Sequence, residues 1–254
     1  MMDAGFKEKF QKNWDKYFPD TELPIAFYYS NLAEIKFMAK PPKGHHCIIG
    51  DLANVRKGKN LCFDTHTIGC GGGKRYLGFQ TEPSPDFEYF LSYGIPGTVE
   101  GERYKKSPEF VQEHLKHQKP FKAPEDHIVF KRWDNLEDDD HPLVVIFFAP
   151  PDVLSGLFTL ANFDESQLYG VIAPFCAGCA SIVDYPYKEL QSPQPRTVLG
   201  MFDVSARPCV SRDVLTLAVP WPKFVRMVDN MEESFLITKS WDKVRSRMIR
   251  GRVT

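Results

Sequence analysis

The chain has 254 residues, of which 32 are lysine or arginine and 33 are aspartate or glutamate, so its formal net charge is −1. This balance argues against nucleic acid as a partner, because proteins that bind nucleic acid usually carry a clear basic excess. Hydrophobic residues make up 43% of the chain. A chain of this length and composition can bury a sufficient core without disulfides or metal. We therefore expect one globular domain over residues 1–254.

The sequence also predicts the compartment. After Met1 and Met2 the chain runs into a charged segment without an apolar stretch, which predicts no signal peptide. The longest apolar run, at residues 143–149, is far too short to cross a bilayer. Without export, the six cysteines are expected to stay reduced. We expect a cytoplasmic protein with no membrane association.

Hydrophobic periodicity predicts short elements in the first half of the chain. Phe6, Phe10, Trp14 and Tyr17 recur at helical spacing and define the apolar face of a first helix. The other predicted elements are a strand at 25–29, a helix at 52–57, a strand at 61–63, a glycine-rich loop at 68–74, helices at 87–93 and 108–117, and an exposed acidic loop at 133–141.

The second half has a clearer pattern. Residues 143–149 are continuously apolar, which predicts a strand covered on both faces. A helix follows Pro150 and is expected to bury Phe158 with its aliphatic neighbours. Further strands are predicted at 171–175, 198–202 and 215–219. A short helix after the cysteine turn is expected to end at 183, and two more helices are predicted at 224–235 and 241–249. Alternating strands and helices predict an α/β (or α+β) fold, with a mixed β-sheet flanked by helices.

Cys176 and Cys179 form a C-x-x-C pair that follows a predicted strand and opens a helix. Backbone amides at a helix start lower the pKa of a thiol, and this spacing lets both sulfurs reach one metal ion, one cluster or each other. Free cysteines are also common as small buried core residues, so the pair alone does not define a site.

Cys70 is the more informative cysteine, because Gly71, Gly72 and Gly73 follow it. Three glycines pack nothing, but they let bare N–H groups approach a bound thiolate–metal centre. We therefore predict that Cys70 joins Cys176 and Cys179 in a metal site.

A tetrahedral centre needs a fourth ligand. Cys47 is the preferred candidate because it follows two histidines in a polar turn. Cys62 and His66 remain alternatives, and Cys209 cannot be placed from the sequence. Ligation by thiolates beside glycine amides favours an iron–sulfur cluster, with zinc or no metal as the alternatives.

Two other functions stay open. The first is a metal-free thiol–disulfide oxidoreductase in which Cys176 and Cys179 cycle between dithiol and disulfide. The second is a module that binds a small anion through Gly71, Gly72 and Gly73 with Lys74 and Arg75, the cysteines being structural. The partner would be an unknown small molecule or a redox protein. The sequence specifies no reaction.

Short segments along nearly the whole chain resemble the domain-of-unknown-function 169 family of bacteria and archaea. They are Glu22-Leu23-Pro24-Ile25, Cys47, Val55-Arg56-Lys57-Gly58, Ile68-Gly69-Cys70, Leu77-Gly78-Phe79, Pro151-Asp152 and Leu199-Gly200. The resemblance implies cysteines at the positions of Cys47, Cys70 and one of the C-x-x-C pair, and it brings no established activity. Common members also have a Gly-Cys-x-Gly-Cys-Arg stretch, where this chain has Gly200-Met201-Phe202-Asp203 without a cysteine.

Overall fold

A computed structural model describes residues 3–250, so Met1, Met2 and residues 251–254 lie outside the described part of the chain. A seven-stranded sheet has the order β2-β3-β1-β4-β7-β6-β5. Neighbouring strands are antiparallel except β5 and β6, which are parallel, so the sheet is mixed. The strands are β1 (Ile25–Ser30), β2 (Leu61–Phe63), β3 (His127–Arg132), β4 (Val144–Ala149), β5 (Val171–Ile172), β6 (Thr197–Gly200) and β7 (Leu215–Pro220).

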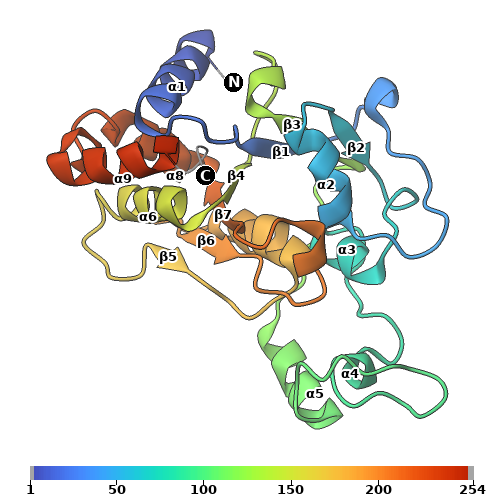
Figure 1. Ribbon diagram of the computed structural model, residues 1–254. Helices are drawn as coiled ribbons and strands as arrows, with labels where there is room; N and C mark the ends of the chain where they lie inside the picture. The colour runs from blue at the N-terminus through green and yellow to red at the C-terminus, as the bar shows by residue number, and fades with distance from the viewer. Residues whose placement is uncertain (1–2, 251–254) are drawn as a thin grey trace.

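Helices cover both faces of the sheet (Figure 1). Helices α1 (Ala4–Tyr17), α6 (Pro151–Ala161), α8 (Trp221–Asn230) and α9 (Lys239–Arg250) build the core on one face. Helices α2 (Ile48–Arg56), α3 (Gly71–Tyr76) and α7 (Tyr185–Glu189), with the π-helical turn η3 (Ala180–Asp184), build the core on the other. The predicted mixed sheet flanked by helices is confirmed.

The central strand β4 shows why the two cores form. All six of its residues are buried, with Val145 and Phe147 in the first core and Val144 and Ile146 in the second. A continuous apolar strand can be buried on both faces only between two helical layers, as its sequence predicted. In the first core the Phe10 ring of α1 lies 4.5 Å from the Trp133 ring, centroid to centroid.

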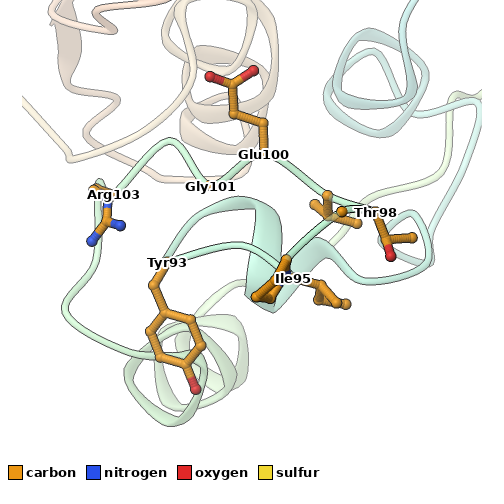
Figure 2. A pocket seen from close by; sticks show the side chains of 9 residues that line it. Tyr93, Ile95, Thr98, Glu100, Gly101 and Arg103 are labelled. Carbon is orange, nitrogen blue, oxygen red and sulfur yellow. The ribbon is translucent and has the colours of Figure 1, made fainter.

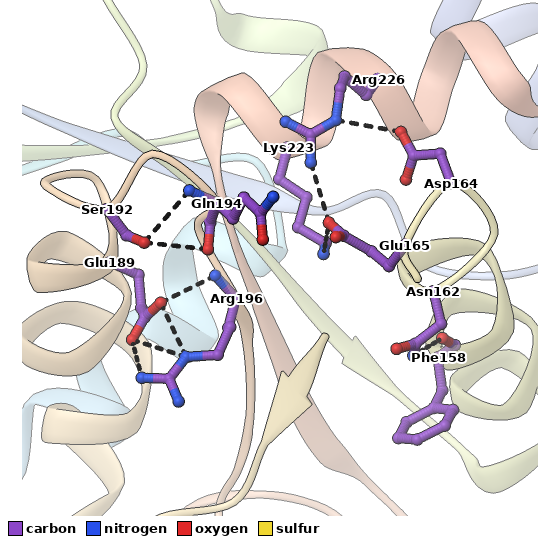
Figure 3. A network of polar contacts seen from close by, with 10 residues as sticks. All are labelled: Phe158, Asn162, Asp164, Glu165, Glu189, Ser192, Gln194, Arg196, Lys223 and Arg226. Carbon is purple, nitrogen blue, oxygen red and sulfur yellow. Dashed lines mark hydrogen bonds and ion pairs between the residues drawn. The ribbon is translucent and has the colours of Figure 1, made fainter. Parts of the chain in front are cut away.

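One polar network ties the loop after α6 to α8 (Figure 3). Lys223 is 1% exposed, and its Nζ lies 2.8 Å from the Glu165 carboxylate. Arg226 contacts the same carboxylate at 3.1 Å and reaches Asp164 at 3.1 Å. The buried ammonium therefore has a charged partner, which a buried charge requires.

Several local predictions were wrong for identifiable reasons. The glycine-rich segment is the helix α3 and not a loop, because Cys70 caps it. The Phe158 side chain is 48% exposed, on the outer side of α6. Asp140 is 4% exposed instead of lying in an open acidic loop, because it pairs with Lys131 at 3.0 Å. The strand expected at 171–175 shrinks to Val171–Ile172 at the sheet edge.

Other boundaries also differ. Strand β3 was not predicted, and α2 begins at Ile48, four residues before the expected start. Helix α4 covers only Phe87–Phe90, whereas α5 (Pro108–His117) has the predicted bounds.

Helices α4 and α5 lie on an excursion of the chain that projects away from the sheet (Figure 1). The excursion contacts the turn that follows β5 through Phe175. Lys105 Nζ lies 4.0 Å from the centre of the Phe175 ring, and the His114 ring packs edge-on against it at 5.7 Å. The C-x-x-C turn is thereby held between the sheet and the excursion.

Among residues 3–250 no helix combines the length and the apolar character needed to span a bilayer.

Candidate functional site

Five of the six cysteines gather on the second face of the sheet. Cys47 is the N-cap of α2 and Cys70 is the N-cap of α3. Cys176 and Cys179 lie between β5 and η3, and Cys209 ends the 3-10 turn η4 (Arg207–Cys209). The thiol of Cys179 lies near those of Cys70, Cys47 and Cys176, whose charges would each raise its pKa. The structure thus brings together the four cysteines predicted as metal ligands.

The sulfur of Cys70 is held by backbone amides. Gly73 N–H donates to Cys70 Sγ at 3.0 Å, and the backbone N–H of Ile48, at the start of α2, donates to the same sulfur. These hydrogen bonds lower the pKa of Cys70, but burial raises it more. Amides that point at a sulfur stabilise a thiolate and tune a metal bound to it.

Gly69 explains how Cys47 comes to lie beside Cys70. A Cβ on Gly69 would stand 2.8 Å from His46 Cβ and 3.1 Å from His46 N. Only a residue without a side chain allows this approach, and His46 N–H donates to the Gly69 carbonyl at 3.2 Å. The glycine before Cys70 therefore positions the segment that ends at Cys47.

The C-x-x-C turn packs on the loop after β6 through another glycine. Gly178 N–H donates to Asp203 Oδ2 at 2.9 Å, and a Cβ on Gly178 would lie 2.9 Å from Ala206 Cβ. Asp203 also accepts hydrogen bonds from Ser205, from its N–H at 3.0 Å and from its hydroxyl at 2.8 Å. Its charge contributes to the raised pKa of Cys70, Cys176, Cys179 and Cys209.

Asp203 was missed by the sequence reasoning. The spacing of Asp203 and Ser205 is typical of a local turn, and that turn was the only available signal. Met201 was also missed. It is 1% exposed, has a left-handed φ of 69°, and its Sδ lies 3.2 Å from the position of a Cβ on Gly178.

Burial controls the protonation of the C-x-x-C pair. It raises the pKa of Cys176 to about 12 and raises the pKa of Cys179 well above its ordinary value. The expectation that helix amides lower these pKa values was wrong. A π-helical turn begins at Ala180, and Cys179 is only 7% exposed, so loss of hydration outweighs the backbone dipoles.

Cys209 finds its place beside Cys47. The two side chains are in hydrogen-bond contact, and burial followed by the charge of Cys47 raises the pKa of Cys209. Both residues are half-buried, in contrast to Cys179.

The remaining predicted residues lie apart from this contact or serve the fold. Cys62 is fully buried in β2, and the backbone N–H of His66 caps a turn by donating to Asp64 at 2.8 Å. Gly71, Gly72 and Gly73 start α3 instead of forming an open cradle. Arg75 is buried and donates to the Thr81 carbonyl, and Lys74 precedes it in the same helix.

Within residues 3–250, no three His, Cys, Asp or Glu side chains already stand in an arrangement that would hold a metal ion. The sulfurs are neighbours, but they do not converge on one point.

A separate hollow of about 540 Å³ lies in the loop between α4 and α5. Its lining comes from one segment, and Figure 2 shows Tyr93 and Glu100 pointing in opposite directions from it. The loop closes on itself through a bridge between Ile95 and Val99 and through the close approach of Gly94 and Gly101. The lining includes no cysteine, so the hollow is distinct from the cluster.

Comparison with known proteins gave one match. The family model DUF169, described as uncharacterised ArCR, matches residues 20–230. No curated protein matched the chain. No solved structure matched it either.

Proposed function

The chain belongs to the DUF169 family, and we propose that it binds a metal centre through the thiolates of Cys70, Cys176, Cys179 and Cys47. The preferred centre is an iron–sulfur cluster with a redox or sensing role, and zinc is the alternative. The observation that supports this most is that three thiols, those of Cys47, Cys70 and Cys176, lie near the thiol of Cys179, so that three separate segments meet there.

The electrostatics of these thiols favour a cation. Burial and mutual repulsion raise the pKa of Cys179, and burial and Asp203 act in the same direction on Cys70. Thiolates that repel one another in a poorly hydrated place are stabilised when a cation replaces their protons. Metal binding would therefore release protons, and the affinity should rise with pH.

Backbone donors support the same conclusion. The N–H groups of Gly73 and Ile48 already point at Cys70 Sγ. The bond from Gly73 caps α3, and donors of this kind also form the outer shell that tunes a thiolate-bound metal.

The structure argues against a C-x-x-C oxidoreductase as the first choice. The reactive form of a cysteine is the thiolate, and reactive cysteines have lowered pKa values. Here the pKa of Cys176 is about 12, and Cys179 is hardly accessible to a substrate.

The test is metal analysis of protein purified without oxygen. The visible spectrum and the iron, acid-labile sulfide and zinc per chain are measured for the wild type, for Cys70→Ser and Cys179→Ser, and for Cys62→Ser as a matched control outside the cluster. We expect a metal in the wild type and in Cys62→Ser, and its loss in the two cluster variants. Brown protein with sulfide identifies an iron–sulfur cluster, and colourless protein with zinc identifies the alternative. Metal-free wild type, also after reconstitution with iron and sulfide or with zinc, would refute the proposal.

A further inference from the structure

Cys209 and Cys47 form a thiol pair that the proposed metal centre does not explain. Their side chains are in contact, although 161 residues lie between them in the sequence. Gly50 lies one turn after Cys47 in α2, and a Cβ placed on it would be 3.8 Å from Cys209 Sγ. Residues three apart share a helix face, so Cys209 packs against the face of α2 that Gly50 shares with Cys47.

Both thiols are attached to ordered backbone. Cys209 N–H donates to the Ala206 carbonyl at 2.9 Å. The Arg207 guanidinium closes the following loop by donating to the carbonyls of Ser211 and Arg212, at 3.2 and 2.6 Å. On the other side, Ile48 is 2% exposed and anchors the start of α2 in the core. The contact is therefore built into the fold.

Accessibility separates this pair from the C-x-x-C pair. Cys47 and Cys209 are both half-buried, so a small molecule can reach them, whereas Cys179 is 7% exposed. Thiol–disulfide exchange needs access to at least one sulfur and a second thiol within bonding reach. In the C-x-x-C pair only Cys176 is half-buried, whereas Cys47 and Cys209 are both half-buried and their side chains are in direct contact.

We infer that Cys47 and Cys209 are a redox-active dithiol that a low-molecular-weight disulfide, such as oxidised glutathione, converts to an intramolecular disulfide. One protein thiol loses its proton and attacks a sulfur of the small disulfide, releasing one small thiolate and leaving a mixed disulfide. The second protein thiol loses its proton and attacks the protein sulfur of that bond, releasing the second small thiolate. Two protein thiols are oxidised by two electrons, and one small disulfide is reduced to two thiols.

A consequence follows for the metal centre, and this part alone rests on the proposed function. Cys47 cannot be a metal ligand while it is bonded to Cys209. Oxidation would therefore remove one of the four proposed sulfurs, and reduction would restore it.

The disulfide is tested on metal-free protein in glutathione buffers of graded oxidised-to-reduced ratio. Free thiols are blocked, and the cysteine peptides are mapped by mass spectrometry. We expect a linked peptide between Cys47 and Cys209, the loss of two of the six free thiols, and unreacted Cys62 in the same digest. Cys209→Ser should instead accumulate glutathione on Cys47. Absence of the linked peptide in the most oxidising buffer, or a link that joins Cys176 to Cys179 in its place, would overturn the inference.

Metal titration of the same samples separates the two proposals. Reduced wild type and Cys209→Ser should bind the metal equally, and the oxidised wild type at least about tenfold more weakly, since about 1.4 kcal/mol corresponds to a factor of ten. If no form binds metal, the proposed function fails while the disulfide stands. Equal metal affinity in the oxidised and reduced wild type would refute the coupling through Cys47.

Discussion

Gly69 offers a direct test of the way in which the fold assembles the cysteine cluster. In Gly69→Ala the new Cβ would lie 2.8 Å from His46 Cβ, 3.0 Å from Pro42 Cβ and 3.1 Å from His46 N. Ordinary carbon contacts are about 3.5–4.0 Å, so the segment that leads to Cys47 must move by roughly 1 Å. One of the crowded atoms belongs to the backbone, which cannot turn aside as a flexible side chain does.

Overpacking of this kind costs about 1–3 kcal/mol. We expect Gly69→Ala to lower the free energy of unfolding by that amount and to move Cys47 away from Cys70. The matched control is Gly72→Ala. Its Cβ meets only the Tyr76 ring, at 3.9 Å, and alanine in place of a helical glycine stabilises by up to about 1 kcal/mol.

The assays are urea unfolding of metal-free protein, followed by tryptophan fluorescence, and metal titration of the folded protein. Gly69→Ala should be less stable and bind metal about tenfold more weakly or worse, while Gly72→Ala should match the wild type in metal affinity. Equal stability of the two variants would refute the close-packing argument. A destabilised Gly69→Ala with unchanged metal affinity would show that Cys47 is not a ligand.

Two further predictions concern stability. Burial raises the pKa of Cys176 to about 12 from an ordinary value of 9.0, so its contribution to the stability of the metal-free fold is complete below about pH 9 and is lost as the pH rises toward 12. Between these two pH values the free energy of unfolding should fall by up to about 1.4 kcal/mol per pH unit because of this thiol. The urea midpoints measured at pH 8 and at pH 10 should therefore differ less in Cys176→Ala than in the wild type. The same pH dependence in the two proteins would contradict the assignment. Glu165→Ala leaves the buried Lys223 ammonium without its partner at 2.8 Å, so the free energy of unfolding measured in urea should fall by about 3–5 kcal/mol. Asp164 lies at the more exposed end of the network in Figure 3, so Asp164→Ala should lower it by at most about 1 kcal/mol. Similar losses of unfolding free energy in both variants would show that the burial of Lys223 does not determine the energy of this network.

The elements that the sequence predicts correctly are those whose pattern comes from burial alone. The aromatic face of α1 and the continuous apolar run of β4 both follow from the two cores. Strand β3 escaped prediction because it contains Lys131, which reads as a surface residue. In the fold that lysine is 1% exposed and pairs with Asp140, which the sequence in turn suggested was exposed. Two buried charges that pair with each other nine residues apart do not show in the hydrophobic pattern of either segment.

The same limit applies to the site. Cys70 and the C-x-x-C pair were identifiable because their neighbours are unusual, but the contact between Cys47 and Cys209 depends on the packing of η4 on α2. Glycines were recognised as important for the wrong reason. Gly71, Gly72 and Gly73 were expected to approach a ligand, but they start α3. Gly69 and Gly178 instead make room for His46 and Ala206. A glycine in a sequence shows that something comes close without showing what.

Burial divides the cluster into two chemical parts. Cys176 and Cys179 are thiols whose raised pKa values oppose formation of a free thiolate at neutral pH, so their ionisation needs a compensating cation. Cys47 and Cys209 are half-buried and in contact, so they can exchange with small disulfides. Cys47 belongs to both parts, because its charge also acts on Cys179. Under the proposed function, a residue shared in this way would link the redox state of the outer pair to the metal occupancy of the inner site, and Cys209→Ser should break this link while leaving all four proposed ligands in place.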